Sequence, residues 1–319
     1  MAYLRKLPGE GKAERVTLED IVDIAHRGDE GRLRDTIRIV RELLVEERRR
    51  DKGLRINGSL AYIPKEGDAI IIGDLHGDEE SLLKILRKTN FVDRVGRGEK
   101  LKLIFLGDYI DRGPNQLEVL NIAFELKRNF SENVVLLKGN HEVLPPSENA
   151  PSGADFLKTF LNRYGNAALY MYKGLYELLM GLPIAAKSEN GILFVHGGVS
   201  EKVKGDISII YVENDVERDL LWSDPRGIEG SRWNDERGLG VQFGKDVLDE
   251  VLKSMGCVVL IRSHEPLEAD MVEMFEGKLL TIFSSERYRK IENRELKIGY
   301  GCVSLEKKID NVSGILRDI

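Results

Sequence analysis

Three short polar motifs, each directly after an apolar run, constrain this chain more than any other feature. They are Gly-Asp-Leu-His-Gly-Asp at 73–78, Gly-Asp-Tyr-Ile-Asp-Arg-Gly at 107–113 and Gly-Asn-His-Glu at 139–142. The apolar runs are typical of buried parallel strands, and leucine spacing predicts helices between them at 79–88 and 116–129. The segment therefore predicts a β-α-β-α-β unit whose motifs meet at the carboxyl edge of a sheet, where ligands bind in open α/β sheets.

The composition permits a substantial core and argues against several classes of function. The 319 residues are 42% hydrophobic and 32% charged, with a net charge of −6. This acidic balance gives no support for nucleic-acid or membrane partners. No apolar run predicts a signal peptide or a bilayer span, so we expect a cytoplasmic protein. Cys257 and Cys302 lie in strand-like apolar contexts, which favours buried free thiols over a disulfide or a metal site.

The segments around the motifs predict the rest of the architecture. A capping box at Thr17 predicts a helix to about His26, and apolar residues at helical spacing predict another over 32–49. We interpret residues 1–65 as an N-terminal helical collar packed on a catalytic domain, 66–319. The Pro-rich segment 145–153 predicts a loop bordering the active cleft, followed by helices at 155–163 and 166–180.

The second half of the chain is rich in predicted strands. These strands, expected to be largely antiparallel, lie at 183–186, 192–195, 257–261, 270–275, 279–283, 297–305 and 312–319. The prediction is thus an α/β (α+β) fold: a central β-sandwich of two mixed sheets flanked by helices, with the site at the carboxyl edge of the β-α-β-α-β strands.

Four of the five histidines follow apolar strands or lie inside the motifs, together with two aspartates and an asparagine. A lone histidine at a strand end is usually a hydrogen-bonded structural residue, but this concentration is hard to explain in that way. The ligand set of carboxylate, imidazole and amide suits a catalytic site for Mn²⁺, Fe or Zn²⁺. The set exceeds what one ion needs, so two ions are indicated, with Asp108 bridging them through its two oxygens.

The motifs, together with His-Gly-Gly at 196–198, resemble those of the PPP-type serine/threonine phosphoprotein phosphatases, within the calcineurin-like metallophosphoesterases. Further matches are Leu-Leu-Trp-Ser-Asp-Pro at 220–225, Asp-Glu-Arg-Gly at 235–238 and Ser-x-x-x-Tyr at 284–288. The resemblance covers about residues 30–305.

The resemblance implies a role for each matched residue. One metal ion would be held by Asp74, His76 and Asp108, and the other by Asp108, Asn140, His196 and His264. The general acid would be His141, oriented by Asp111. The phosphate would be bound by Arg112, Arg237 and Asn140, with Tyr288 at the border of its pocket. A salt bridge between Asp111 and Arg112 that only shapes the turn is the structural alternative. Asp224, Glu142 and Glu265 are interpreted as groups that orient their neighbours, although Asp224 could equally form a loop turn.

The activity implied is hydrolysis of phosphoserine and phosphothreonine in proteins or peptides. A hydroxide shared by two divalent ions, Mn²⁺ first and Fe or Zn as alternatives, would attack phosphorus in line while His141 protonates the leaving alkoxide. One alternative is a related hydrolase of dinucleoside polyphosphates or phosphodiesters. Another is a binding module that has lost catalysis, which the complete set of predicted residues disfavours. A regulatory subunit is not predictable from the sequence.

Some positions depart from the family pattern. The Pro-rich segment follows the third motif directly, Arg289 stands where the family has cysteine, and Ser-Glu-Arg at 285–287 replaces Ala-Pro-Asn. Substrate preference and toxin sensitivity therefore do not carry over. With the chain ending at a predicted strand and no regulatory tail, these departures favour a prokaryotic-type member.

Overall fold

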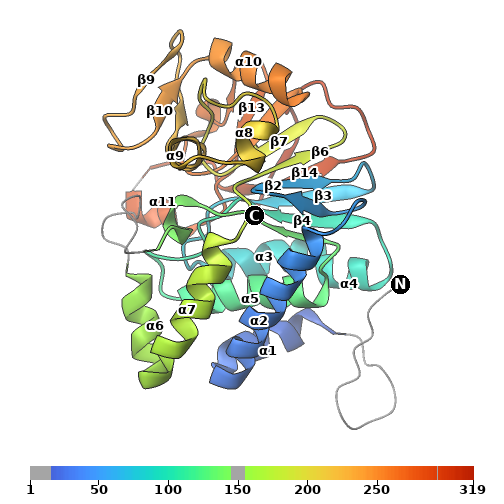
Figure 1. Ribbon diagram of the computed structural model, residues 1–319, viewed down its shortest axis with the longest axis vertical. Helices are drawn as coiled ribbons and strands as arrows, with labels where there is room; N and C mark the ends of the chain where they lie inside the picture. The colour runs from blue at the N-terminus through green and yellow to red at the C-terminus, as the bar shows by residue number, and fades with distance from the viewer. Residues whose placement is uncertain (1–15, 145–154, 293) are drawn as a thin grey trace.

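The computed structural model of the protein describes residues 16–144, 155–292 and 294–319. Figure 1 shows strands in the middle of the molecule, with α1–α7 on one side and α8–α10 on the other. This arrangement confirms the predicted α/β fold of mixed sheets flanked by helices. The loop predicted at 145–153 lies outside the described residues.

The predicted β-α-β-α-β unit supplies three of the strands of a five-stranded sheet ordered β15-β14-β3-β4-β5, from its middle to one edge. Strands β3 (Asp68–Ile72), β4 (Leu101–Phe105) and β5 (Val134–Leu136) are parallel, with Ile71 beside Ile104. Helices α3 (Glu79–Thr89), α4 (Phe91–Gly96) and α5 (Gln116–Asn129) connect them. On the other edge, β14 (Gly299–Ser304) and β15 (Leu316–Asp318) are antiparallel.

The second sheet has seven strands, ordered β1-β2-β6-β7-β11-β13-β12. Their bounds are β1 Arg55–Asn57, β2 Leu60–Ile63, β6 Ala185–Ser188, β7 Ile192–Val195, β11 Val259–Arg262, β12 Glu273–Met274 and β13 Leu279–Thr281. The prediction of largely antiparallel strands is confirmed for β6 with β7, β12 with β13 and β14 with β15. It was wrong for β7, β11 and β13, which are parallel neighbours. Parallel pairing needs a long crossover, and the segment between β7 and β11 supplies one through α10 (Lys245–Met255).

Two further parts of the second half differ from the prediction. The strand predicted at 270–275 is a 3-10 turn, η2 (Ala269–Met271), followed by the two-residue β12. A small sheet that was not predicted has the order β8-β10-β9, formed by Asp224–Pro225, Val241–Phe243 and Ser231–Trp233. Short helices α8 (Ile207–Ile210), α9 (Asn214–Trp222) and α11 (Arg287–Glu292) lie between the strands.

The N-terminal helices pack against the helical side of the five-stranded sheet. Helix α1 (Leu18–Arg27) begins with the predicted capping box, in which Thr17 and Asp20 exchange hydrogen bonds. Helix α2 (Glu30–Glu47) contacts α5 and α7 (Asn166–Met180), and α6 (Phe156–Tyr164) lies beside α7. The division of the chain at residue 65 stays a proposal.

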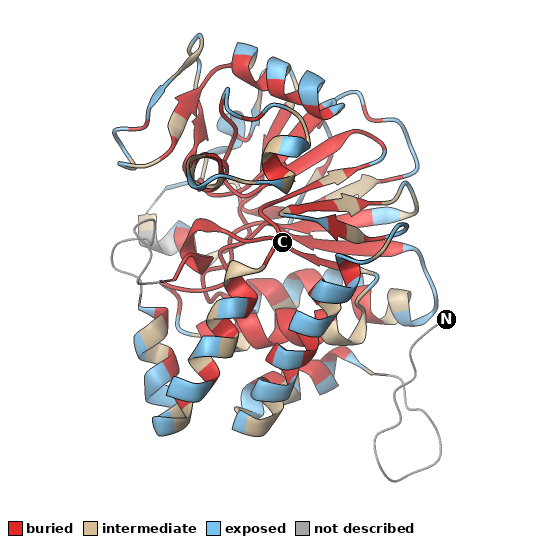
Figure 2. Ribbon diagram, viewed as in Figure 1, coloured by how far each residue is buried: buried red, intermediate tan, exposed pale blue. Residues whose placement is uncertain are grey.

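Figure 2 shows that burial continues from the strands into the loops at their carboxyl ends. The main core joins the apolar faces of the five-stranded sheet to α1, α2, α3 and α5. Cys257 is buried and Cys302 is partly buried, and both are free thiols. No helix within the described ranges has both the length and the apolar character needed to cross a membrane.

Candidate active site

Five loops, each at the carboxyl end of a strand, bring the predicted metal-binding residues together. The loop after β3 carries two of them, and the loops after β4, β5, β7 and β11 carry one each. All six side chains are at most 5% exposed: Asp74, His76, Asp108, Asn140, His196 and His264. These six side chains, which are spread between positions 74 and 264 of the sequence, therefore share one buried region, as the sequence predicted.

Most of the strained backbone conformations in the described residues lie in these loops. Among the described residues, eight non-glycine residues have positive φ, and five of them are His76, Asp108, Asp111, Arg112 and His264. Such conformations cost energy for side chains with a Cβ and persist where the surroundings enforce them.

Tight packing between two of the loops supplies that enforcement. A Cβ on Gly107 would lie 2.3 Å from the backbone nitrogen of Gly139, so only glycine fits. The buried Glu142 carboxylate accepts hydrogen bonds from the backbone N–H groups of Asp108, Tyr109 and Gly139, at 2.7, 3.0 and 2.8 Å. Glu142 thereby ties the loop after β4 to the loop after β5, which supports its predicted orienting role.

His76 forms one group of lone pairs with two carboxylates. Its Nδ1 lies 2.9 Å from the carbonyl oxygen of Ile110, which can only accept, so Nδ1 carries the hydrogen. Its Nε2 then faces Asp74 Oδ2 at 3.5 Å and Asp108 Oδ2 at 3.4 Å. This is the ligand orientation common in metal sites, with the far nitrogen held by a carbonyl.

His196 forms a second group with the same logic. Its Nδ1 lies 3.1 Å from the carbonyl oxygen of Leu106, and burial lowers the pKa of the ring to about 4. Its Nε2 lone pair therefore faces Asn140 Oδ1 at 2.8 Å, His264 Nδ1 at 3.1 Å and Asp108 Oδ2 at 3.4 Å. A neutral imidazole has one hydrogen, so these contacts cannot all be hydrogen bonds.

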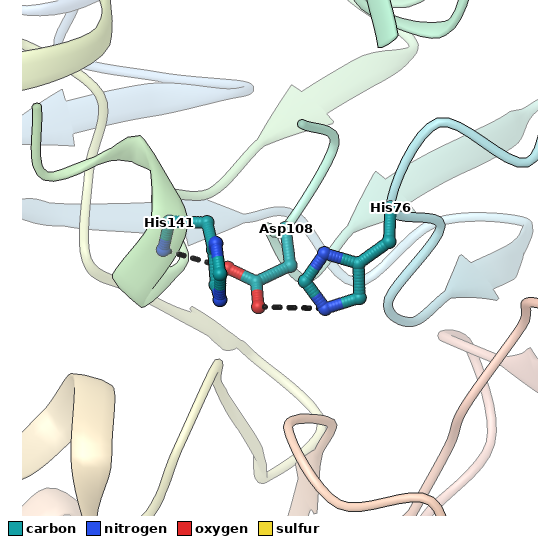
Figure 3. Close-up of side chains that lie close together, drawn as sticks. All are labelled: His76, Asp108 and His141. Carbon is teal, nitrogen blue, oxygen red and sulfur yellow. Dashed lines mark hydrogen bonds and ion pairs between the residues drawn. The ribbon is translucent and has the colours of Figure 1, made fainter. Parts of the chain in front are cut away.

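Asp108 belongs to both groups through a single oxygen. Its Oδ1 accepts the backbone N–H of His141 at 3.0 Å, and its Oδ2 faces His76 (Figure 3). The same Oδ2 also faces His196. This differs from the expectation of a bridge through both oxygens. Burial, followed by the charges of Asp74 and Glu142, raises the pKa of Asp108 well above its usual value.

These observations fit a pair of cations. Carboxylate, imidazole and amide groups converge in two clusters, and like charges crowd the oxygen that the clusters share. The donors are carboxylate, imidazole and amide, as catalytic sites for divalent metals require. Ligand atoms of Asp108, His196 and His264 lie within 4.8 Å of one another, and so do those of His76, Asp108 and His141.

His141 borders the first group, but its ring contacts the side chains of Asp111 and Arg112 and not a backbone carbonyl. Its Nδ1 and Asp111 Oδ2 are 2.7 Å apart, and its Nε2 lies 3.3 Å from Arg112 Nη2. An arginine N–H can only donate, so Nε2 carries a lone pair here. Burial lowers the pKa of His141 to about 4, although the hydrogen bond that Nδ1 donates to Asp111 opposes this shift.

Arg112 and Tyr288 form the predicted edge of the site. Arg112 Nη1 donates to the Tyr288 hydroxyl at 2.9 Å, and the Tyr288 ring stacks on His76 with centroids 5.6 Å apart. Asp111 turns the other way, since its Oδ1 accepts from the backbone N–H groups of Asp155 and Phe156. The two motif residues thus serve separate partners, which argues against the alternative of a salt bridge that only shapes the turn.

Arg237, the second predicted phosphate ligand, reaches the site from the small sheet. Its Nε donates to Asp224 Oδ2 at 3.0 Å, and Asp224 Oδ1 lies 4.0 Å from Nε2 of His264. Asp224 is fully buried and also accepts from Asn234 at 2.9 Å. These contacts support the orienting interpretation of Asp224 over a simple loop turn.

The sequence reasoning missed two residues that hold the site together. Arg262 is fully buried and pairs with Asp224 at 3.1 Å and with Glu265 at 2.6 Å. Ser263 hydrogen-bonds both the backbone nitrogen and the carboxylate of Asp74. The sequence did contain a signal for Arg262, which is a charged residue at the end of the apolar run of β11. A buried arginine needs carboxylate partners, so its position predicts an ion pair.

A comparison of the sequence with protein families identifies one match. The sequence model of the calcineurin-like phosphoesterases matches residues 69–268, the part of the chain that contains all six predicted metal ligands. The chain belongs to this family. Of its predicted metal ligands, Asp74 is the first in the sequence and His264 is the last.

Curated relatives of this calcineurin-like phosphoesterase include several serine/threonine-protein phosphatases. One from Caenorhabditis elegans is 32% identical over 70% of this chain and 48% of the relative, so the chain spans about half the length of that relative. The phosphatase 4 catalytic subunit of Kluyveromyces lactis is 31% identical over 68% of this chain and 69% of the subunit. The phosphatase 6 catalytic subunit of Caenorhabditis elegans is 30% identical over 73% of this chain and 69% of the subunit.

Among solved structures, a serine/threonine phosphatase from Saccharomyces cerevisiae with similarity to human phosphatase PP5 shares the fold. The two superpose with a TM-score of 0.66 over 81% of this phosphoesterase and 79% of the yeast chain, at 23% identity. At that identity the likeness establishes the architecture alone.

Proposed function

We propose that this phosphoesterase is a metal-dependent protein serine/threonine phosphatase. One observation carries the proposal: two clusters of lone pairs share Asp108 Oδ2 and lie directly beside His141. Relatives of 30–32% identity that are named serine/threonine-protein phosphatases support the substrate class. The substrate would be a phosphoprotein or phosphopeptide, met in the cytoplasm.

The site would hold two divalent ions, with Mn²⁺ as the first choice and Fe or Zn as alternatives. One ion would be bound by Asp74, His76 and Asp108, and the other by Asp108, Asn140, His196 and His264. Bound in this way, a cation pair supplies an activated water and neutralises charge on the phosphoryl group. The rings of His76 and His196, each held by a carbonyl oxygen at Nδ1, turn Nε2 toward the carboxylates for this role.

Arg112 and Arg237 would bind the phosphate oxygens. Tyr288 holds one nitrogen of Arg112 and Asp224 holds Nε of Arg237, so each guanidinium keeps further N–H groups for a ligand. A planar guanidinium matches the geometry of phosphate oxygens and can donate two parallel hydrogen bonds. Asn140 would add an amide to the same pocket.

His141 would protonate the leaving alkoxide. A phosphate between Arg112 and His141 takes over the guanidinium donor that now meets Nε2 and brings negative charge beside the ring. Both changes favour a proton on Nε2, because an opposite charge stabilises the imidazolium. Asp111 holds Nδ1, so the proton is delivered from the nitrogen that faces the site.

Turnover of three substrates by the Mn²⁺-loaded protein tests the proposal. The substrates are a phosphoserine or phosphothreonine peptide, a chromogenic phosphodiester and diadenosine tetraphosphate. We expect the phosphopeptide to dominate and chelated, metal-free protein to be inactive until Mn²⁺ is returned. Preference for either of the other substrates would favour the alternative dinuclear hydrolase, and full activity without metal would refute the metal-dependent reaction.

A further inference from the structure

Asp78, the last residue of the first motif, fastens the loop that carries Tyr288. Asp78 is 8% exposed and lies two residues after His76. Its Oδ2 accepts hydrogen bonds from Ser285 Oγ at 2.9 Å and from the backbone N–H of Arg287 at 3.0 Å. The residue immediately before Tyr288 in the chain is thus bonded to the start of α3.

Ser81 strengthens the same attachment. Its hydroxyl donates to Asp78 Oδ2 at 2.8 Å and accepts the backbone N–H of Glu286 at 3.1 Å. On the outside, Lys84 pairs with the Glu286 carboxylate at 2.6 Å. Three successive residues, 285–287, are therefore held by the first two turns of α3.

The other end of this connection is the phosphate edge of the site. Tyr288 is 3% exposed, its ring stacks on His76, and its hydroxyl accepts from Arg112. Arg112 in turn reaches Nε2 of His141. A shift of the loop at 285–287 would move the Tyr288 hydroxyl and release the nitrogen of Arg112 that it holds.

The helix-capping role of Asp78 accounts for only some of its hydrogen bonds. As the N-cap of α3, it needs a single oxygen, and Oδ1 fills that role by accepting the N–H of Ser81 at 3.1 Å. Oδ2 accepts the remaining hydrogen bonds, two of them from the loop at 285–287. Ser285 belongs to the stretch that departs from the family pattern, so its hydrogen bond to Asp78 is not part of that pattern.

We propose that Asp78 is a positioning residue for phosphate binding, which acts through Ser285 and the Arg287 backbone on Tyr288 and so on Arg112. The inference rests on the proposed function, because it requires Arg112 to bind the phosphate. Its consequence is that substitutions at Asp78 and Ser285 weaken phosphate binding without removing a group that touches the phosphate.

The test measures competitive inhibition by inorganic phosphate, together with KM and kcat for a phosphopeptide, in Mn²⁺-loaded variants. Ser285→Ala removes one hydrogen bond and leaves the helix cap intact, and we expect phosphate inhibition to weaken about 3- to 10-fold. Asp78→Ala should weaken it at least as much. Both should raise KM more than they lower kcat and should keep the metal content.

Asp78→Asn tests the chemistry of the contact. An amide oxygen turned toward Ser285 keeps the acceptor for the loop, while its NH₂ faces the helix and loses the cap. We therefore expect Asn to recover most of the phosphate affinity that Ala loses. Asp29→Ala is the matched control, because Asp29 caps α2 through Arg32 N–H at 2.9 Å and lies on a different helix.

Two benchmark variants separate this inference from the proposed function. If Arg112→Lys leaves phosphate inhibition unchanged, the proposed binding of phosphate by Arg112 is refuted, whatever the variants of Asp78 and Ser285 show. If Arg112→Lys and Tyr288→Phe weaken inhibition but Ser285→Ala and Asp78→Ala do not, the positioning role is refuted. Equal weakening by Asp29→Ala would also refute it, since a general loss of stability would then explain the effect. The double variant Ser285→Ala/Tyr288→Phe should weaken inhibition no more than Tyr288→Phe.

Discussion

Asp111 and His141 are joined by one buried hydrogen bond, with 2.7 Å between Oδ2 and Nδ1. The other oxygen of Asp111 accepts two backbone N–H groups at the start of α6. The carboxylate is therefore fixed before any ligand binds, and it fixes the ring with Nε2 toward the lone-pair groups. Helix α6, outside the three motifs, thus helps to orient the proposed acid.

Asp111→Asn should slow the reaction while leaving the metals in place. The amide can present its oxygen to Nδ1 but no longer carries the charge that favours the imidazolium, so proton donation weakens. We expect kcat to fall by about 10²-fold or more, within the range for general-acid catalysis. The measurement is kcat against a phosphoserine peptide, with metal content determined in parallel. An unchanged kcat would contradict the acid assignment.

Metal content separates the roles of Asp108 and His141. Asp108→Asn should lose both ions, because Oδ2 is the atom common to the two lone-pair groups. His141→Ala should keep them and lose about 10²- to 10⁴-fold in kcat. Elemental analysis of the purified variants decides between the roles. Loss of metal from His141→Ala would instead make His141 a ligand, as its distance from Asp108 and His76 also permits.

Arg237→Ala should mainly raise KM and weaken inhibition by free phosphate. The guanidinium is anchored by the buried Asp224, so its removal takes away a fixed positive charge from the proposed phosphate pocket. Arg226→Ala is a control of the same chemistry, because Arg226 pairs mainly with Glu265 and Glu236 and approaches Asp224 only at 4.0 Å. An unchanged phosphate affinity in Arg237→Ala would argue against its role.

The packing of the N-terminal helix α2 should depend on a buried ion pair. Glu47 and Lys127 are 2.5 Å apart with side chains at most 2% exposed, and Lys127 also donates to two backbone carbonyls. Glu47→Gln leaves a buried cation without its partner and should lower the unfolding free energy by about 3–5 kcal/mol. Urea denaturation measures this.

Two comparisons check the Glu47 result. The exposed pair of Arg38 and Glu42 is the control, and Glu42→Gln should cost less than about 1 kcal/mol. The double variant Glu47→Leu/Lys127→Met should recover most of the loss, since it removes both charges. Equal costs for Glu47→Gln and Glu42→Gln would contradict the predicted importance of the buried pair.

The two thiols should differ in reactivity. Burial raises the pKa of Cys257 to about 11, whereas Cys302, whose pKa is also raised by burial, is less buried. Because the thiolate is the reactive form, a disulfide reagent at pH 8 should modify Cys302 first, and Cys257 should react faster as the pH rises. Cys257→Ser assigns the signals, and preferential labelling of Cys257 in the folded protein would contradict this expectation.

The sequence predicted the β-α-β-α-β unit well because the signals for its strands and motifs are local. An apolar run followed by a polar motif identifies a strand and its carboxyl end, and parallel strands bring those ends to one edge. His76, Asp108 and Asn140 could therefore be placed together without a structure. Strand direction in the second half was not encoded in this way, since an apolar run looks the same in a parallel and an antiparallel pair.

Contacts between distant residues were decided only by the tertiary structure. The sequence indicated the carboxylates and imidazoles of the proposed site, because they follow apolar runs, but not Arg262 and Ser263. The fold decided that Asp108 faces both groups with one oxygen, that the buried Arg262 pairs with Asp224, and that Asp78 meets Ser285 across 207 positions. The physical reason is that a side-chain hydrogen bond depends on distance and angle, which local propensity does not specify.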